Sequence, residues 1–188
     1  MDAERITEAD RLPKLRSGPV RLRGFEPTDL GLVEAAAADP LIPLISTVPS
    51  PFSKVAGRRF IEAQRHRLAE GYGYSFVITE GASGDPVGSI GLWLRDLDLG
   101  RATVGYWVIG PARGRRVATN ALQAVSRWAL VDLAVPRLEL SVEPWNEPSI
   151  RTAEANGFVR EGLLRGYQPV GTERRDVYLY SLLRTDLD

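Results

Sequence analysis

The stretch that decides the fold is Gly105-Tyr106-Trp107-Val108-Ile109-Gly110-Pro111-Ala112-Arg113-Gly114-Arg115-Arg116-Val117-Ala118-Thr119. Its first part is typical of a strand, which we predict over Thr103–Ile109, and the turn after it opens a long helix predicted over about 114–131. The first backbone N–H groups of a helix lack intrahelical acceptors, and the positive end of the helix dipole lies there. The stretch therefore predicts an anion site suited to a pyrophosphate, and the arginines at 113, 115 and 116 add charged donors. A solvated basic turn is the alternative.

The patterns on either side predict the remaining elements. Further strands are expected at Val20–Phe25, Tyr74–Glu80, Pro86–Leu94, Leu138–Val142, Phe158–Leu163 and Asp176–Leu183, and further helices at Leu30–Ala38, 54–70 and 147–156. The stretch 39–53 holds four prolines and is predicted not to form regular helix. The resulting order, β-α-α-β-β-β-α-β-α-β-β, predicts an α/β (α+β) fold with a mixed sheet and helices on its faces.

Composition excludes several kinds of site. The 24 basic residues balance the 24 acidic ones, which argues against nucleic acid or a membrane surface as the partner. There is no cysteine, and His66 is the only histidine, so we expect no metal site and no cysteine nucleophile. No apolar run approaches the roughly 20 residues that cross a bilayer. We expect a soluble cytoplasmic protein, with an N-terminal arm over 1–17 and a single domain over 18–188.

Several separate motifs resemble one family. Arg-Gly-Arg-Arg-Val-Ala, from Arg113 to Ala118, resembles the pyrophosphate loop of GNAT acetyltransferases, Gln/Arg-x-x-Gly-x-Gly/Ala. Asn146-Glu147-Pro148-Ser149 and Ala155-Asn156-Gly157-Phe158 are similar to the RimJ/RimL branch of that superfamily, as are Gly105-Tyr106-Trp107 and Arg174-Arg175-Asp176-Val177. The resemblance covers about 18–184 and implies a mostly antiparallel seven-stranded sheet with about four helices and a splayed central strand pair.

The resemblance also implies where acetyl-coenzyme A (acetyl-CoA) binds. The pantetheine arm lies between the splayed strands, on the backbone of Trp107, Val108 and Ile109, and the pyrophosphate lies on the backbone of residues 114–119. The loop residues so implicated are Arg113, Gly114, Arg115, Arg116, Val117, Ala118 and Thr119. Asn146 holds the pantetheine amides; its alternative role is that of a helix N-cap, and it can serve both purposes. Ser149 lies near the sulfur, or is an ordinary serine of a first helical turn.

The implied reaction is direct attack of an amine on the thioester, without an acyl-enzyme. The backbone N–H of Val108 polarises the carbonyl and Ser149 protonates the leaving thiolate, so Val108, Asn146 and Ser149 are the catalytic candidates. Transfer of a larger acyl group than acetyl stays open. The acceptors expected are a protein N-terminus, a polyamine or a small amine, and a homodimer is compatible with the exposed final strands.

The sequence departs from the family pattern in three places. Arg116 stands where the loop usually has glycine, which permits close approach of phosphate. Thr103 and Gln168 stand where relatives carry a carboxylate base, and neither side chain takes a proton at neutral pH. Ala153 replaces the tyrosine acid of many GNAT enzymes, a residue that the RimJ/RimL branch commonly lacks.

No general base is therefore obvious. The carboxylates in the right regions belong to Glu143, Glu147, Glu173 and Asp176. For Asp176 a structural pairing with Arg174 or Arg175 is the stronger reading. His66 has a useful pKa range, but a histidine on an arginine-rich helix face is more often solvated.

We expect the acceptor pocket to form from residues 41–56, the helix 54–70 and the loop 164–174, with Trp145 and Tyr167 as walls. Two other functions remain open. The missing carboxylates favour an acyl-CoA-binding module, a sensor or scaffold with little catalysis. The cluster Arg113–Arg116 could contact nucleic acid, although the zero net charge weighs against it.

Overall fold

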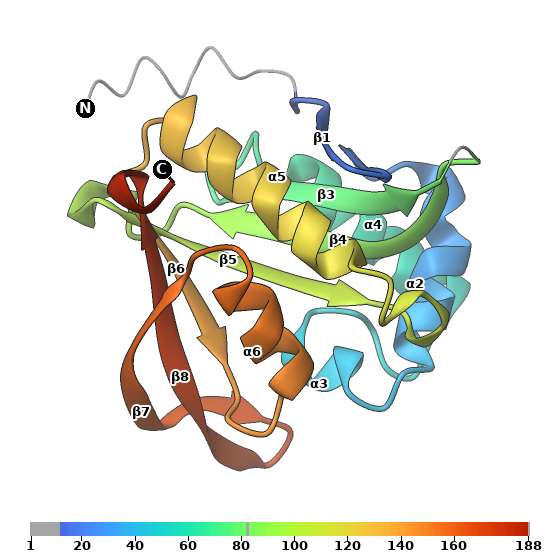
Figure 1. Ribbon diagram of the computed structural model, residues 1–188. Coiled ribbons are helices and arrows are strands. Elements are labelled where there is room, and N and C mark those ends of the chain that lie inside the picture. The colour runs from blue at the N-terminus through green and yellow to red at the C-terminus, as the bar shows by residue number, and fades with distance from the viewer. Residues whose placement is uncertain (1–11, 82, 188) are drawn as a thin grey trace.

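A computed structural model describes residues 12–81 and 83–187. Within these residues eight strands form one sheet in the order β1-β2-β3-β4-β5-β6-β8-β7 (Figure 1). The strands are β1 (Leu15–Ser17), β2 (Val20–Arg23), β3 (Gly73–Glu80), β4 (Asp85–Trp93), β5 (Arg101–Val108), β6 (Arg137–Val142), β7 (Val159–Val170) and β8 (Glu173–Leu183). Among the eight described strands, only β5 and β6 pair in parallel. The mixed, mostly antiparallel sheet is confirmed, with one strand more than predicted, β1.

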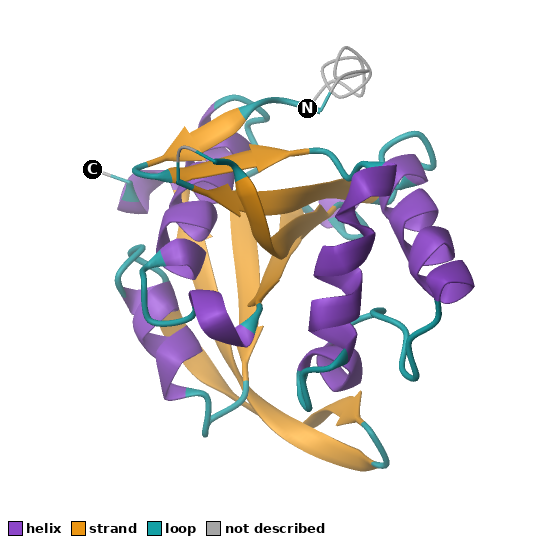
Figure 2. Ribbon diagram, turned by 90° about the vertical axis from the view of Figure 1, so that its right-hand side faces the viewer, coloured by secondary structure: helices purple, strands orange, loops and turns teal. Residues whose placement is uncertain are grey.

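Helices cover both faces of the sheet (Figure 2). They are α2 (Leu30–Ala37), α3 (Ile42–Ile45), α4 (Lys54–His66), α5 (Val117–Val131) and α6 (Glu147–Glu154), with short 3-10 turns between some elements. The prediction that 39–53 holds no regular helix is wrong for one turn, α3. Pro43 is accommodated there because it stands at the start of the helix, where its missing N–H is not needed.

Successive side chains of a strand point to opposite faces of the sheet, so the protein has two hydrophobic cores, one on each face. On one face, Ala121, Leu122 and Val125 of α5 pack with alternate strand residues such as Phe76. On the other face, Phe60 of α4 packs with Val77, the next residue along β3. The apolar spacing of α5 thus buries the side that the sequence predicts.

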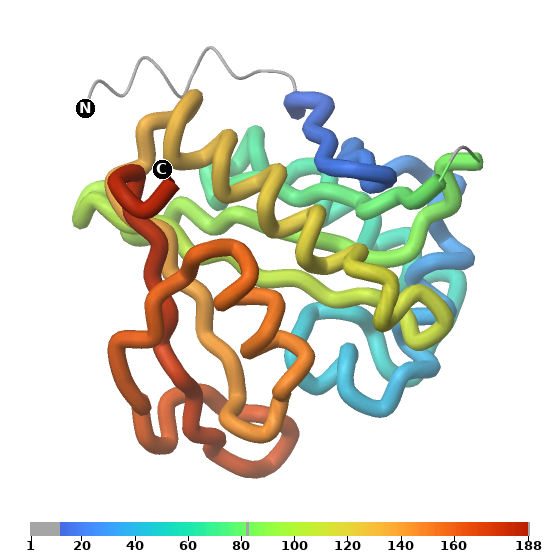
Figure 3. Tube along the Cα trace, in the orientation of Figure 1, coloured from blue at the N-terminus to red at the C-terminus, as the bar shows by residue number. Residues whose placement is uncertain are grey.

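The two chain ends of the domain differ in how they join the sheet. Residues 1–11 of the expected N-terminal arm lie outside the described residues, and the last residues of that arm, Leu15–Ser17, pair with β2 as an edge strand. At the other edge, β7 and β8 form a long hairpin that Figure 3 traces to a turn beside α3. The hairpin turn at Gly171 lies against Leu44 of α3, since a Cβ on that glycine would be 3.7 Å from Leu44 Cδ2. Among the described residues, no helix has the length and hydropathy to cross a membrane.

Candidate active site

The two central strands separate soon after they meet. β5 and β6 are paired only over Arg101–Thr103 and Arg137–Glu139, and beyond that point β6 continues beside β8 while β5 continues beside β4. The later part of β5 therefore has a free edge. The splayed strand pair expected from the resemblance is confirmed.

The backbone of Val108 faces this opening. Ile109 donates its N–H to Val87 O on β4 at 3.0 Å, and β4 and β5 are antiparallel with Gly88 opposite Val108. Because N–H groups alternate in direction along a strand, the N–H of Val108 points away from β4 and into the gap. The N–H of Ile109 is already used within the sheet. Of the three backbone positions expected to meet pantetheine, Val108 is the one with an available donor.

The turn after β5 ends in a helix start without a side-chain cap. The helix α5 begins at Val117, three residues later than predicted, because Gly114 and Arg116 adopt left-handed backbone conformations with φ of 78° and 61°. The first intrahelical bond runs from Asn120 N to Arg116 O at 3.0 Å. The N–H groups of Val117, Ala118 and Thr119 thus remain without intrahelical acceptors at the positive end of a 15-residue helix.

Arg116 occupies the loop's glycine position in the conformation that glycine adopts most easily. For a residue with a Cβ, the left-handed region costs roughly 1–2 kcal/mol. Arg116 therefore differs from the usual glycine in having a side chain and in the strain of its left-handed backbone. The backbone of the loop still follows the path that a glycine would allow.

The other two loop arginines are held by carboxylates. Arg113 donates from Nη2 to Asp39 at 2.6 Å and from Nε to Val108 O at 2.9 Å, and Arg115 pairs with Glu80 at 2.7 Å. Burial raises the pKa of Asp39, but the N–H groups after it and Arg113 outweigh burial and hold that pKa below its usual value. Arg113 and Arg115 shape the turn, which leaves the side chain of Arg116 as the more available cation.

Asn146 and Ser149 stand at the start of α6, on the cavity wall. Asn146 is the N-cap, and its Oδ1 accepts from Ser149 N at 3.2 Å. The N-cap interpretation of Asn146 is confirmed, and it leaves the Nδ2 group with two N–H donors for a ligand.

A buried tyrosine hydroxyl adjoins Ser149. Burial raises the pKa of Tyr106, while the nearby hydroxyls of Ser149 and Thr152 lower it in part. These hydroxyls lie near Tyr106 Oη without hydrogen-bonding geometry, so within the described chain that buried oxygen has no hydrogen-bond partner.

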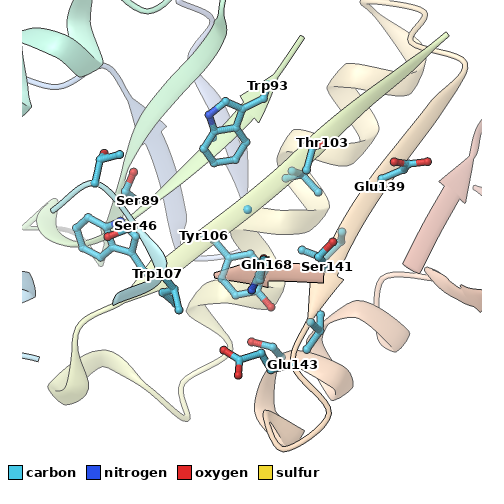
Figure 4. Close-up of a pocket in the computed structure, with 18 of the residues that line it drawn as sticks. Ser46, Ser89, Trp93, Thr103, Tyr106, Trp107, Glu139, Ser141, Glu143 and Gln168 are labelled. Carbon is cyan, nitrogen blue, oxygen red and sulfur yellow. The ribbon is translucent and has the colours of Figure 1, made fainter. Parts of the chain in front are cut away.

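A cavity of about 720 Å³ connects Asn146 and Ser149 with the α4 side of the sheet. Figure 4 shows Trp93 and Thr103 toward one end and Glu143 at the other, with Tyr106 and Gln168 between them. Parts of α3, α4, β3–β6 and β7 line it, and the lining includes residues from each of the segments 41–56, 54–70 and 164–174. That this cavity receives the acceptor stays a prediction. Within it, the buried Ser75 donates to Gln64 Oε1 at 2.8 Å.

Several residues predicted as the general base or as walls of the cavity lie outside its lining or have other partners. His66 is exposed beside Glu62 and outside the cavity lining. Asp176 accepts from Gly166 N at 2.6 Å, so its structural partner is a backbone group and not the predicted arginines. Trp145 is exposed and outside the lining, whereas Tyr167 is one of the walls.

Other candidate carboxylates are held by partners. Glu173 pairs with Arg175 at 2.8 Å, and Glu147 with Arg151 at 3.6 Å. Glu143 lines the cavity, is buried, and accepts from Trp145 Nε1 at 2.7 Å.

Two features of the cavity were not predicted from the sequence. Glu139 lines the cavity directly opposite Thr103 in the β5–β6 pairing, and it is bound to Arg137 at 2.8 Å. Arg67 lies over the ring of Trp93 with 5.2 Å between Cζ and the ring centroid. The alternation of Leu138–Val142 could have placed Glu139 on the cavity face, but the stacked pair depends on tertiary packing.

The sequence matches the acetyltransferase (GNAT) domain family over residues 20–159. The chain belongs to the GNAT acetyltransferase family. It is 30% identical over 166 residues to the uncharacterized N-acetyltransferase p20 of Bacillus licheniformis, covering 88% of this chain and 93% of that protein.

Solved structures agree with this membership. The RimJ protein of Mycobacterium smegmatis, in complex with CoA-disulfide, superposes with a TM-score of 0.76 at 25% identity, covering 93% of this chain and 88% of that one. A GNAT-family acetyltransferase of Bacillus anthracis has the same fold, with a TM-score of 0.76 at 21% identity over 91% and 98% of the two chains. The RimJ/RimL-like resemblance is confirmed, and with it an N-acetyltransferase of the GNAT family, whose members use acetyl-CoA.

Proposed function

We propose that this GNAT enzyme transfers the acetyl group of acetyl-CoA to a primary amine by direct attack within a ternary complex. The acceptor classes are a protein N-terminus, a polyamine or a small amine. The observation that carries the proposal is the gap between β5 and β6, which presents the Val108 N–H and leads both to the uncapped start of α5 and to the α4-side cavity.

The chain's own groups fit the cofactor. The free N–H groups of Val117, Ala118 and Thr119 suit a pyrophosphate, and the Nδ2 group of Asn146 suits an amide carbonyl of pantetheine. The loop from Arg113 to Arg116 sets the backbone path between these two ends. Acetyl-CoA supplies an activated thioester when it is bound.

Three tasks remain for the protein. The Val108 N–H would stabilise the negative charge that develops on the carbonyl oxygen. Ser149 would donate a hydrogen bond to the departing thiolate, a modest contribution because a thiol has a pKa of roughly 8.5 and the thiolate leaves readily, taking its proton from solvent. Glu139 and Glu143 on the cavity wall are the carboxylates in place of Thr103 and Gln168, and either could receive the amine proton directly or through water.

The experiment separates cofactor binding from helix capping. Calorimetric titration with acetyl-CoA should give micromolar affinity, about −8 kcal/mol. Asn146→Asp keeps an N-cap acceptor but loses the Nδ2 donors, so this variant should fold normally and bind acetyl-CoA more weakly. Ser83→Ala, on the β3–β4 turn and outside the lining of the cavity that holds Ser149, is the matched control for Ser149→Ala and should leave turnover unchanged.

Turnover is measured as release of CoA thiol with a panel of amines. Release that needs an amine and falls in Ser149→Ala supports the proposal. Micromolar binding without turnover by any amine would instead favour the acyl-CoA-binding module. Absence of binding up to millimolar acetyl-CoA would refute both.

A further inference from the structure

The acceptor side of the cavity contains a cation that has no carboxylate partner among residues 12–81 and 83–187. Arg67, just after α4, is half-buried and lines the cavity, and its guanidinium lies over the ring of Trp93. Burial lowers the pKa of Arg67 and the neighbouring charge of Arg95 lowers it further, with no carboxylate contributing among the described residues. An arginine retains its charge under these conditions. The site thus concentrates positive charge that no carboxylate of the described part of the chain compensates.

The carboxylates of the same cavity are already bound to other groups. Asp96 lies 3.4 Å from Arg101, Glu139 pairs with Arg137 at 2.8 Å, and Glu143 accepts from the indole of Trp145. None of these three is paired with Arg67. An anion from outside the chain would therefore meet Arg67 without displacing an internal ion pair.

The floor below Arg67 is shaped to hold the stacked pair. Gly91 and Gly105 are opposite each other on β4 and β5. A Cβ on Gly91 would lie 3.0 Å from Trp93 Cη2 and 3.3 Å from Arg67 Nη1, and a Cβ on Gly105 would lie 3.1 Å from Trp93 Cζ3. Any larger residue at either position would push the indole away. The two glycines give Trp93 the room to lie flat below the guanidinium (Figure 4 shows Trp93 beside Thr103).

This cation is separate from the site expected for the cofactor phosphates. Arg67 lies above Gly91 and Gly105, on the α4 face of the sheet, whereas the start of α5 follows Val108 on the other face. Gly105 is three residues from Val108, or roughly 10 Å along an extended strand. Arg67 thus lies in the same cavity as Ser149, where it would meet the end of the acceptor that is far from the reacting amine.

From this geometry we infer that the acceptor is a primary amine that carries an oxyanion, a carboxylate or a phosphate, which binds to the edge of the Arg67 guanidinium while Trp93 packs against one face of that group. A guanidinium presents several N–H donors in a plane and binds such groups with two parallel bonds. The inference rests on the proposed function and selects among its acceptors. It disfavours polyamines, whose distal end is cationic.

Matched acceptors test the inference. The first series is ω-amino acids from glycine to 6-aminohexanoate, each compared with its carboxamide. The second compares 2-aminoethyl phosphate with ethanolamine. We expect kcat/KM from CoA-thiol release to be about tenfold or more higher for the anionic member of at least one pair, as a charge-assisted pair of bonds requires. The series with the larger ratio identifies carboxylate or phosphate as the natural group.

The variants locate the effect. Arg67→Gln should abolish the preference through a rise in KM for the anionic amine, while the neutral partner's kcat/KM and the affinity for acetyl-CoA stay unchanged. Arg67→Lys should retain part of the preference, since it keeps the charge but not the planar fork. Arg58→Gln, which removes an exposed charge from α4, the helix that Arg67 follows, should leave the preference intact.

The outcomes separate this inference from the proposed function. Equal kcat/KM within every pair, or a preference that survives in Arg67→Gln, overturns the anionic acceptor while amine acetylation stands. Failure of all amines, neutral and anionic, overturns acetyl transfer itself and the inference with it.

Discussion

The Nη2 atom of Arg113 lies 2.6 Å from Oδ2 of Asp39, a contact that joins the turn before α5 to the loop between α2 and α3. The same arginine donates to Val108 O. One side chain thus links the free strand edge, the turn before α5 and the segment that leads into α3, which lines the cavity.

We predict that Arg113 and Asp39 are energetically coupled. In a double-mutant cycle with Arg113→Gln and Asp39→Asn, the coupling free energy should be about 1 kcal/mol, because Arg113 is half exposed and solvent screens the pair. Urea unfolding of the four proteins measures it. A coupling within error of zero would show that the contact does not stabilise the fold.

Arg116 provides a test of backbone strain. Arg116→Gly and Arg116→Ala both remove the guanidinium, but only glycine occupies φ of 61° without a Cβ penalty. The glycine variant should be about 1 kcal/mol more stable than the alanine variant. The two variants should bind acetyl-CoA with similar affinity, and any loss relative to the native chain then reports the side chain. Equal stability of the two variants would contradict the left-handed conformation.

Removal of two different tyrosine hydroxyls should have different effects on the free energy of unfolding. Tyr106→Phe removes a buried oxygen without a hydrogen bond in the described chain, so the free energy of unfolding should stay the same or rise by up to about 1 kcal/mol. Tyr180→Phe removes a hydroxyl that donates to Glu154 Oε1 at 3.3 Å, and stability should fall by about 1 kcal/mol. Thermal or urea unfolding measures both, and destabilisation by Tyr106→Phe would indicate a bond partner for that hydroxyl.

Glu161 should contribute to the pH dependence of stability. Hydrogen bonds from Arg137 and Ser181 lower the pKa of Glu161 to about 2. Its pKa is lower in the folded chain than in the unfolded one, so its contribution is present above the unfolded value and is lost as the pH falls toward about 2. The stability difference between the native chain and Glu161→Gln should therefore shrink between roughly pH 4.5 and pH 2. Unfolding curves across this range measure it, and a constant difference would contradict the shift.

The elements and their order were predictable because their signals are local. The apolar spacing of α5 and the alternation of the strands do not depend on distant contacts. The start of α5 was misplaced by three residues because the left-handed conformation of Arg116 carries no local signal, whereas a glycine there would have marked it.

Parts of the site depended on long-range register. The position of Glu139 opposite Thr103 requires the parallel pairing of two strands separated by a helix, which the sequence does not specify residue by residue. The stacking of Arg67 on Trp93 likewise depends on how α4 lies over β4. The places of Asn146 and Ser149 at the start of α6 were predictable because a short motif with a capping role fixes both, and their roles toward a cofactor stay predictions.

The two faces of the sheet have consequences for how this protein can change. Residues that would select the acceptor, such as Arg67 and Trp93, lie on the α4 face, while the uncapped start of α5 belongs to the opposite layer. Substitutions in one layer can therefore alter which amine is accepted without disturbing the other. A lineage that starts from such a chain can explore new acceptors one residue at a time and retain its acyl donor throughout.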